Sequence, residues 1–149
     1  MFENLKKIRE TYELTQRDMA KVLEISKSSY NNYETGEQII PLKRLNDFCN
    51  KFHVSIDYVS SLTNKNTYIP NTYKLNKIEI GKRMKQIRLK NKLTQEELAL
   101  ILNTTQSNIS SYEQGKTLII TAFLYNFAKH FSISMDYITL RSNTEKIQK

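Results

Sequence analysis

The sequence contains few of the residues that support disulfides, phosphate-binding loops or strained turns. One cysteine, three glycines and two prolines occur in 149 residues, and tryptophan is absent. A single cysteine cannot close a disulfide within the chain, so we expect a reducing cytoplasmic compartment and a small core residue at Cys49. Three glycines are too few for a glycine-rich phosphate loop, which excludes that class of nucleotide site.

Long hydrophobic runs and clusters of metal ligands are also missing. The most apolar stretch, residues 118–125, is much shorter than the ~18–20 residues that span a membrane, and the start MFENLKKIRE has no apolar signal core. We expect His53 and His130 to be helix-cap or surface residues rather than metal ligands. The sequence therefore predicts no membrane partner, no metal, no cofactor and no enzymatic activity, since clustered carboxylates for catalytic metal ions are lacking.

Basic residues outnumber acidic ones. The formal net charge is +8 and the isoelectric point is near 9.5. Charge of this sign favours a polyanionic partner such as a nucleic acid.

The chain contains an internal repeat. A shift of 79 positions aligns residues 2–62 with residues 81–141 without a gap, and about 19 of the 61 aligned pairs are identical. Self-similarity of this kind indicates a duplicated structural unit. We predict two domains, residues 1–62 and 78–141, joined by a polar linker at 63–77 and followed by a flexible tail at 142–149.

Helical signals dominate both domains, so the predicted class is all-α. Apolar residues recur at helical spacing, and strand-like alternation is nearly absent. Capping boxes at Thr15 and Thr94 predict the start of a second helix in each domain. The third helices are expected to begin at Ser26 and Thr105 and to stop at glycines 36 and 115.

Two further helices complete each predicted domain. Pro41 is suited to the first turn of a fourth helix, whose counterpart starts after Thr121. Ser55 and Ser134 are positioned to cap a fifth helix in SIDYV and SMDYI. Each domain is thus expected to contain five helices.

The repeated motif resembles a known family. The pattern LTQxx(M/L)AxxL, a turn, a polar helix ending in YExG, and then (V/I)SxDY resembles the phage repressor and Cro type of helix-turn-helix protein, often called the Xre family. The resemblance covers both domains. It implies two tandem lambda-repressor-like domains, binding of double-stranded operator DNA with the third helix in the major groove, and transcriptional control, with repression as the expected mode.

The third helices carry side chains that suit this role. Gln and Asn pair bidentately with adenine, and Ser and Thr bond several bases, while Lys reaches guanine or phosphate. By resemblance, Gln95 and Gln16 match a phosphate contact at the start of the second helix. The predicted DNA-binding residues of the second domain are Gln95, Thr105, Gln106, Ser107, Asn108, Ser111 and Lys116. Those of the first domain are Gln16, Ser26, Lys27, Ser28, Ser29 and Asn32.

Two features of the motif concern its architecture. Arg9 and Glu34, like Arg88 and Glu113, match a pair that in phage repressors bridges the first helix to the end of the third, so we predict two structural salt bridges. The turn between the second and third helices usually carries glycine in this family. Here it carries Glu24 and Asn103, and asparagine tolerates a left-handed backbone better than glutamate does, so a strained or altered turn at Glu24 is expected.

The two copies differ in charge. Residues 2–62 carry nine basic and nine acidic residues, whereas residues 78–141 carry nine basic and five acidic ones. Directly after the third helix, Glu37 in the first copy corresponds to Lys116 in the second, beside the expected phosphate backbone. We therefore hypothesise that the second domain is the stronger DNA anchor and that the first reads a half-site weakly or contacts a protein partner, as an antitoxin or phage regulator would.

The linker and the oligomeric state allow alternatives. Fifteen extended residues could reach ~50 Å, more than the ~34 Å between successive major grooves on one face of DNA. Alternatively, Tyr68, Ile69 and Tyr73 could dock the linker on a domain. We expect a homodimer, for which residues 119–120 and Phe123 offer an apolar patch, although two linked domains can mimic a dimer by raising the effective concentration.

Overall fold

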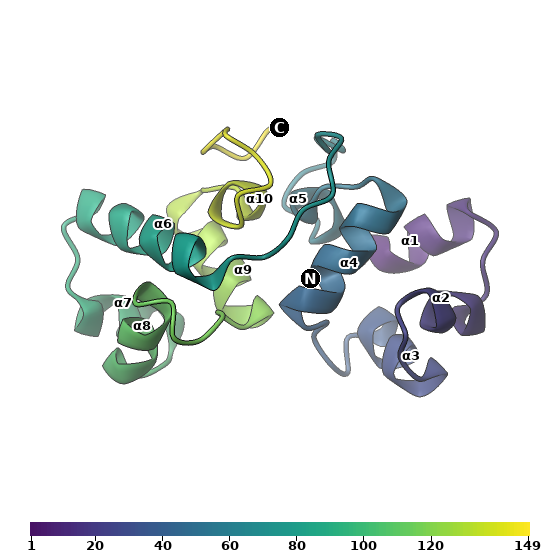
Figure 1. Ribbon diagram of the computed structural model, residues 1–149, viewed down its shortest axis with the longest axis horizontal. Helices are drawn as coiled ribbons and strands as arrows, with labels where there is room; N and C mark the ends of the chain where they lie inside the picture. The colour runs from purple at the N-terminus through teal and green to yellow at the C-terminus, as the bar shows by residue number, and fades with distance from the viewer. The chain divides into compact units, whose positions relative to one another are not determined.

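The computed structural model describes residues 1–149 and divides into two compact units, each of five α-helices (Figure 1). Unit 1 comprises Met1–Tyr73 with Ile147–Lys149, and unit 2 comprises Lys74–Lys146. The all-α class and the two tandem domains are as the repeat predicts. No helix has the length and apolar character that crossing a membrane requires.

The helices of the two units correspond in order. Unit 1 contains α1 (Asn4–Thr11), α2 (Gln16–Val22), α3 (Lys27–Thr35), α4 (Leu42–Phe52) and α5 (Ile56–Val59). Unit 2 contains α6 (Lys77–Lys90), α7 (Gln95–Leu102), α8 (Gln106–Glu113), α9 (Thr121–Phe131) and α10 (Met135–Ile138). Pro41 precedes α4 as its N-cap, so its fixed φ of −59° directs the chain into the helix without occupying it.

Capping side chains set the starts of the second and third helices. Thr15 and Asp18 form a complete capping box before α2, and Thr94 and Glu97 form one before α7. The third helices start as expected too, because the hydroxyls of residues 26 and 105 accept from backbone N–H groups three residues on. These local bonds satisfy amides that a helix start leaves unpaired.

The core of each unit is built from the same aligned positions. Besides Cys49 and Ala128, seven pairs of apolar side chains that correspond at a shift of 79 are 0% exposed. They are Leu5, Met19, Tyr30, Leu45, Phe48, Ile56 and Val59 in unit 1, and Met84, Leu98, Ile109, Leu124, Phe127, Met135 and Ile138 in unit 2. Cys49 is buried beside them, as expected for a small core residue. Burial of this apolar surface is the main force that holds such small domains together.

Left-handed backbone conformations recur at aligned positions. Besides glycines 36 and 115, four pairs of non-glycine residues have φ between 52° and 64°, namely Glu13 and Lys92, Glu24 and Asn103, His53 and Ser132, and Ser61 and Leu140. The turn at Glu24 therefore has the same geometry as the turn at Asn103, with φ near 55° in both. Asparagine can stabilise this left-handed conformation by a local hydrogen bond from its short side chain, and glutamate cannot. The backbone of the turn is therefore unaltered at Glu24, and the strain comes from placing glutamate in it.

The predicted linker is largely part of unit 1. Asn46 and Asn50 donate from their side-chain amides to the Tyr73 carbonyl at 2.9 and 2.8 Å, and the His53 ring stacks on Tyr68 at 5.3 Å. Asn66 accepts from the Ser55 amide at 2.9 Å. Residues 63–73 thus follow the docking alternative rather than the extended one.

The predicted flexible tail also has defined contacts. Ile133 and Lys146 form an isolated antiparallel bridge, and the Ser134 amide donates to the Glu145 carbonyl at 2.8 Å. The Lys90 ammonium pairs with the Glu145 carboxylate at 3.1 Å. Residues 142–146 therefore pack on unit 2, a contact between segments distant in sequence that composition does not reveal.

Candidate nucleic-acid interface

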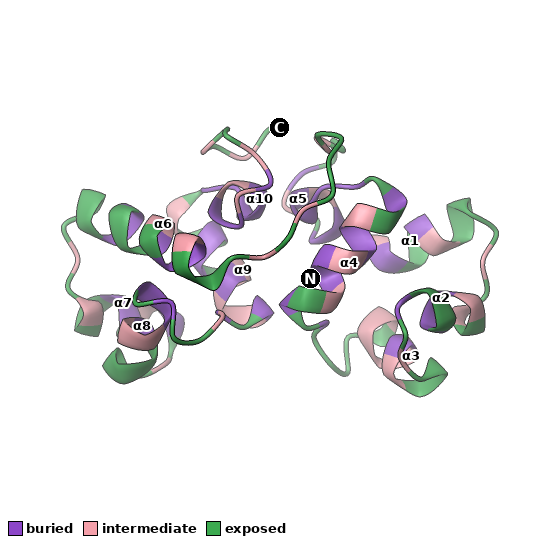
Figure 2. Cartoon of the chain, viewed as in Figure 1, coloured by how far each residue is buried: buried purple, intermediate pink, exposed green.

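Each unit presents a short pair of helices joined by a tight turn. α2 packs on α3, and α7 packs on α8. The inward side of α8 carries Ile109 and Tyr112, which are buried, whereas its outward side is exposed (Figure 2). The exposed residues at the start of α8 are Thr105, Gln106, Ser107 and Asn108, and Ser111 one turn later is half-buried. The outward surface of α8 is therefore uncharged and rich in hydrogen-bonding groups.

An arginine–glutamate pair ties the first helix of each unit to the end of its third helix. In unit 2, the Arg88 Nε and Nη2 atoms donate to the two carboxylate oxygens of Glu113 at 2.6 and 2.9 Å. In unit 1, Arg9 donates to Glu34 in the same bidentate manner at 2.5 and 3.2 Å. The glutamate side chains are only 2% and 4% exposed, and the pair is buried in unit 2 and partly buried in unit 1.

Protonation of these groups follows from their contacts. The hydrogen bond to Glu113 raises the pKa of the Arg88 guanidinium above its ordinary value. Burial alone would raise the pKa of the Glu34 carboxyl, but hydrogen bonds from Arg9 and Gln16 outweigh burial and hold this pKa below its ordinary value. Glu34 is therefore ionised at neutral pH and forms an ion pair with Arg9.

In unit 2, a chain of hydrogen bonds links this ion pair to the surface of α8. The Gln95 Nε2 atom donates to Glu113 Oε2 at 3.0 Å, which leaves Gln95 Oε1 as an acceptor. The Gln106 Nε2 atom donates to Gln95 Oε1 at 2.6 Å. The orientation of Gln106 is thus fixed by three buried or half-buried residues behind it, and its own Oε1 atom and second N–H remain available.

Unit 1 repeats only the inner part of this chain. Gln16 Nε2 donates to Glu34 Oε2 at 3.0 Å and to Asn31 Oδ1 at 3.1 Å. The position of Gln106 is taken by Lys27, whose side chain is exposed. The Gln95–Gln106 pair of unit 2 therefore has a different counterpart in unit 1. There Gln16 is hydrogen-bonded to Glu34 and Asn31, and the exposed Lys27 stands at the position of Gln106.

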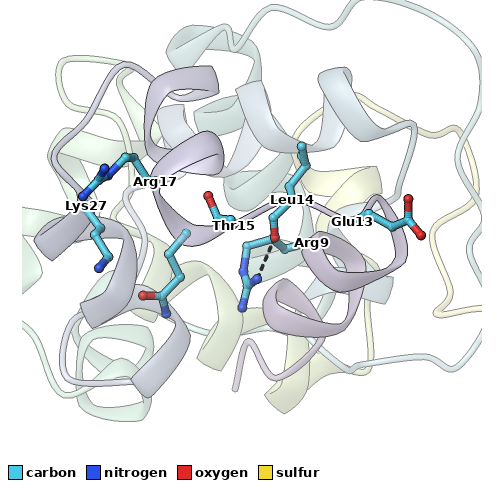
Figure 3. A pocket seen from close by; sticks show the side chains of 7 residues that line it. Arg9, Glu13, Leu14, Thr15, Arg17 and Lys27 are labelled. Atoms are coloured by element: carbon cyan, nitrogen blue, oxygen red, sulfur yellow. Dashed lines mark hydrogen bonds between the residues drawn. The ribbon is translucent and has the colours of Figure 1, made fainter.

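A surface pocket of about 510 Å³ lies beside Gln16 in unit 1 (Figure 3). Figure 3 shows Arg17 and Lys27 at one side of this pocket, Arg9 nearer its centre and Glu13 at the opposite side. Arg9 is occupied by Glu34 and by the Leu14 carbonyl at 2.8 Å. Arg17 and Lys27 are exposed, which makes them the cations of this pocket that can meet an anionic group from solvent.

The structure assigns several predicted DNA-binding residues to capping. Thr105 accepts from the Asn108 amide at 3.1 Å, and the Asn108 side chain donates to Thr104 Oγ1 at 2.8 Å. In unit 1, the Ser26 hydroxyl accepts from the Ser29 amide at 3.0 Å and donates to Ser29 Oγ at 2.9 Å. These hydroxyls hold the helix starts, so contacts to bases from them compete with capping bonds.

The remaining predicted residues differ between the units near the end of the third helix. Ser107 and Ser28 are exposed, as are Lys116 and Glu37. The neighbours of the Asn32 amide favour the orientation in which its nitrogen faces Glu37, and in that orientation the nitrogen donates to the carboxylate at 3.2 Å. In unit 1, Glu37 therefore lies beside Asn32, a predicted DNA-binding residue. In unit 2, the aligned residues are Lys116 and Ser111.

The charge surplus of unit 2 lies mostly outside the helix-turn-helix surface. Residues 13–38 carry three basic and five acidic residues, and residues 92–117 carry two basic and three acidic ones, so the two motifs have nearly equal net charge. The surplus lies on α6, whose residues Lys82, Lys85 and Lys90 are exposed. The charge differences between the two motifs therefore lie at individual positions, such as Glu37 and Lys116.

Two residues important to the site were not singled out by sequence reasoning. Arg17 lines the pocket next to Lys27, and Asn31 holds the Gln16 amide. Arg17 directly follows Gln16 at an exposed position in the first turn of α2, a signal that was present in the sequence. The apolar patch expected to support dimerisation is smaller than predicted, because Ile119 is buried in the core while Ile120 is exposed and Phe123 is half-buried.

Comparison with known proteins agrees with this geometry. The helix-turn-helix family model matches residues 5–59 and again residues 84–138, which together make up most of the chain. The chain therefore belongs to the helix-turn-helix family, and it contains two copies of the domain. This result confirms the resemblance drawn from the repeated motif.

Relatives are found among bacterial regulators. The chain is 36% identical over 53 residues to the antitoxin PezA of Streptococcus pneumoniae, covering 36% of this chain and 34% of PezA. It is 34% identical over 61 residues to the uncharacterised regulator YobD of Bacillus subtilis, covering 41% and 54%. It is 31% identical over 78 residues to the transcriptional regulator ImmR of Bacillus subtilis, covering 48% and 61%. The chain thus spans between about a third and three fifths of the length of these relatives.

Among solved structures, the clp gene regulator ClgR from Corynebacterium glutamicum matches 46% of this chain and 72% of its own chain. The TM-score is 0.42, with 18% sequence identity.

Proposed function

We propose that the protein is a sequence-selective, double-stranded-DNA-binding transcriptional regulator of the Xre type. The observation that carries this proposal is the hydrogen-bonded chain from Arg88 through Glu113 and Gln95 to Gln106. It holds an uncharged side chain of α8 in one orientation at the molecular surface. Fixed donors and acceptors on an exposed helix are what reading of base edges in a major groove requires.

Adenine fits the groups that Gln106 leaves available. Its Nε2 atom is committed in part to Gln95, so a second N–H and the Oε1 acceptor face outward. Adenine presents an N7 acceptor and an N6 amino donor in the major groove, which pair with these two groups. Ser107 and Ser111 then contact neighbouring bases. Thr105 and Asn108 act mainly by holding the helix start.

Phosphate contacts come from the starts of α2 and α7 and from exposed cations. Gln95 and Gln16 lie in the first turn of these helices, where backbone amides and the helix dipole favour an anion. Lys116 adds a cation after α8 in unit 2, while Arg17 and Lys27 add two in unit 1. These contacts supply affinity that is independent of sequence.

Under this proposal the two units have different roles in DNA binding. Unit 2 discriminates bases through the Gln95–Gln106 pair, and Lys116 anchors it beside the backbone. Unit 1 attaches mainly to phosphates through Arg17 and Lys27, because Lys27 stands at the position of Gln106 and the Asn32 amide faces Glu37. We infer repression by occupation of an operator in the cytoplasm, with a homodimer matching a two-fold site.

Selection of bound fragments from random duplex DNA tests the proposal most directly. We expect an enriched site with A·T pairs at fixed positions and at least a hundredfold preference over random duplex in gel shifts at physiological salt. Micromolar binding that is blind to sequence would contradict sequence-selective regulation. The spacing of enriched half-sites, together with light scattering of the complex, decides between a dimer and a monomer that uses both units.

A second function is favoured by the likeness to PezA, whose name describes an antitoxin, and by the exposed side chains of Glu37 and Ile39 beside the end of α3. In this alternative, the main partner is a protein target that one helix-turn-helix copy holds, and binding to DNA is weak and blind to sequence. Isolation of a stable, stoichiometric protein complex that survives nuclease treatment would support this alternative. Selective DNA binding by the purified chain alone would favour the first proposal.

A further inference from the structure

The segment after the fifth helix is bonded to its own unit at the same aligned positions in both copies. In unit 1, the Ser55 amide donates to Asn66 Oδ1 at 2.9 Å. In unit 2, the Ser134 amide donates to the Glu145 carbonyl at 2.8 Å. The two donors correspond at a shift of 79, and so do the two acceptors. The repeated structure therefore extends past the aligned sequences, which end at residues 62 and 141.

A second contact in this segment also repeats. The Lys65 amide donates to Thr63 Oγ1 at 3.2 Å, and the aligned Thr144 amide donates to Ser142 Oγ at 3.0 Å. Bonds of this kind from a hydroxyl to the following backbone hold a turn, so they compete with an extended, solvated chain. Because two different sequences form the same contacts at the same positions, the docked segment is a regular part of each domain.

Unit 1 holds the chain further, as far as Tyr73. Asn46 and Asn50 of α4 both donate to the Tyr73 carbonyl, and the Tyr73 amide donates to Asn50 Oδ1 at 3.2 Å. The residues of unit 2 that align with these two asparagines are Tyr125 and Lys129, neither of which carries a side-chain amide. Docking of residues 67–73 is therefore a property of unit 1 that the repeat does not share.

The residues that follow are fixed to unit 2. The Asn76 side chain caps α6 by accepting from two backbone amides of its first turn, both at 3.1 Å. The Lys77 ammonium donates to the carbonyl of Lys116, in the loop directly after α8, at 3.1 Å. A Cβ atom added to Gly81 would lie 2.1 Å from the Tyr112 carbonyl oxygen, so α6 packs closely on α8. The linker therefore joins unit 2 beside its third helix.

Only Lys74 and Leu75 lie between these two fixed ends. Three Cα–Cα steps join Tyr73 to Asn76, so the Cα atoms of these two residues are at most ~11 Å apart. Release of residues 63–73 from unit 1 would add roughly 36 Å of extended chain, which is about one helical turn of DNA at ~34 Å. The docked segment therefore decides whether the tandem has a short or a long reach along a duplex.

We propose that docking of residues 63–73 sets the offset, on one DNA duplex, between the base pairs that unit 2 reads and the phosphates that unit 1 contacts. The inference rests on the proposed function, in which unit 1 attaches mainly to phosphates. Phosphate contacts carry no sequence information, so unit 1 has no preferred position of its own. A short tether concentrates unit 1 over a few phosphates, whereas a long one spreads it along the flank. Asn46 and Asn50 are the positioning residues, because they hold the last docked residue.

Phosphate-ethylation interference tests the offset on the duplex that the full-length chain selects from random DNA. We expect one cluster of essential phosphates that Arg17→Gln weakens, at a single distance from the selected bases. Insertion of ten residues, five Gly-Ser repeats, between Leu75 and Asn76 leaves every docking bond in place. This insertion should spread the Arg17-dependent cluster over at least twice as many phosphates and leave the unit 2 cluster unchanged.

Two substitution variants complement the insertion. The double variant Asn46→Ala, Asn50→Ala removes both donors to the Tyr73 carbonyl and should spread the same cluster. Asn64→Ala, at an exposed asparagine of the docked segment, is the matched control and should leave the cluster as it is in the wild-type chain. A merely structural role of the two asparagines would lower affinity without moving or spreading the cluster.

A measurement without DNA tests the tether itself. Spin labels are attached to Lys21→Cys and Leu100→Cys, two aligned and exposed positions, in a Cys49→Ala chain, and distances are recorded by pulsed electron paramagnetic resonance. Ten flexible residues have a root-mean-square length of roughly 17 Å, so the insertion should extend the longest populated distances by at least ~10 Å.

The outcomes separate this proposal from the proposed function. A wild-type distance distribution as broad as that of the insertion variant would overturn the docked tether. An Arg17-dependent cluster of unchanged position and width in the insertion variant would overturn the offset, as would a selected site with no such cluster. If the chain selects no DNA site, the proposed function fails and the offset fails with it, whatever the label distances show.

Discussion

The Gln106 side chain donates a hydrogen bond to Gln95 Oε1 at 2.6 Å, and Gln95 in turn donates to Glu113. A residue of the second helix therefore orients a residue of the third, and both depend on an ion pair to the first helix. The aligned Lys27 of unit 1 has a different side-chain chemistry, so the two copies of one motif present different chemistry at one position.

This pair should behave as one recognition unit. Gln106→Ala is expected to weaken binding to a selected site by ~1–3 kcal/mol with little effect on random duplex. Gln95→Leu should relax preference at the same base pair, because Gln106 then loses its orienting partner. The double variant should be no more than slightly weaker than the worse single variant, since the two effects share one cause. Additive losses in competition gel shifts would mean that the residues act separately.

Lys116 and Glu37 should affect the salt dependence of DNA binding in opposite directions. Each phosphate contact contributes about −0.9 to the slope of log affinity against log salt concentration. Lys116→Gln is expected to make the slope about one unit shallower, and Glu37→Lys to make it steeper. Fluorescence anisotropy across a salt series measures both. Unchanged slopes in the two variants would show that neither residue lies beside the backbone.

Arg17 and Lys27 should supply phosphate contacts in unit 1. Arg17→Gln and Lys27→Gln are each expected to make the salt slope shallower by about one unit and to lower affinity for all sequences alike. Lys6→Gln is the matched control. It removes a charge from an exposed position of α1, outside the helix-turn-helix, and should change the slope by much less. Equal effects of the three substitutions would indicate that only net charge matters.

The Arg9–Glu34 pair should make unit 1 sensitive to acid. The pKa of Glu34 is lowered in the folded state from an ordinary value of 4.5. Its contribution to stability is therefore fully present above pH 4.5 and disappears as the pH falls through the lower folded-state pKa. Arg9→Met should destabilise unit 1 by up to ~3 kcal/mol at pH 7, because the Glu34 carboxylate keeps the hydrogen bond from Gln16 but loses its counter-ion.

Thermal unfolding followed by circular dichroism between pH 3 and pH 7 measures this contribution. Glu34→Gln, although less stable at pH 7, should lose less stability on acidification than the wild-type chain does. Identical pH profiles for the two proteins would assign the acid sensitivity to other carboxylates.

Glu24 should be a site at which stability can be gained. Its φ of 55° lies in the left-handed region, where a side chain without local compensation is strained. Glu24→Asn is expected to raise the free energy of unfolding of unit 1 by up to ~1 kcal/mol, and Asn103→Glu to lower that of unit 2 by a similar amount. Chemical denaturation of both variants provides the measurement. Shifts of equal sign would contradict the strain argument.

The sequence alone determined the repeat, the all-α class and the helix starts. Capping boxes at Thr15 and Thr94, buried positions spaced 79 residues apart and stop signals at glycines 36 and 115 are local patterns, so each can be recognised in the sequence. The two arginine–glutamate pairs were predicted because the family resemblance supplied the contact, and the local pattern does not contain it.

Tertiary structure decided the rest, because packing between distant segments outweighs local preference. Of five aligned pairs of left-handed residues, only one is marked by glycine, and the others carry residues as different as Ser61 and Leu140. Residues 63–73 and 142–146 look like a free linker and tail in composition, yet their backbone groups find partners on the two units. The order Arg88, Glu113, Gln95, Gln106 was likewise invisible in the chain, since it joins three helices through side-chain bonds that form only when those helices pack.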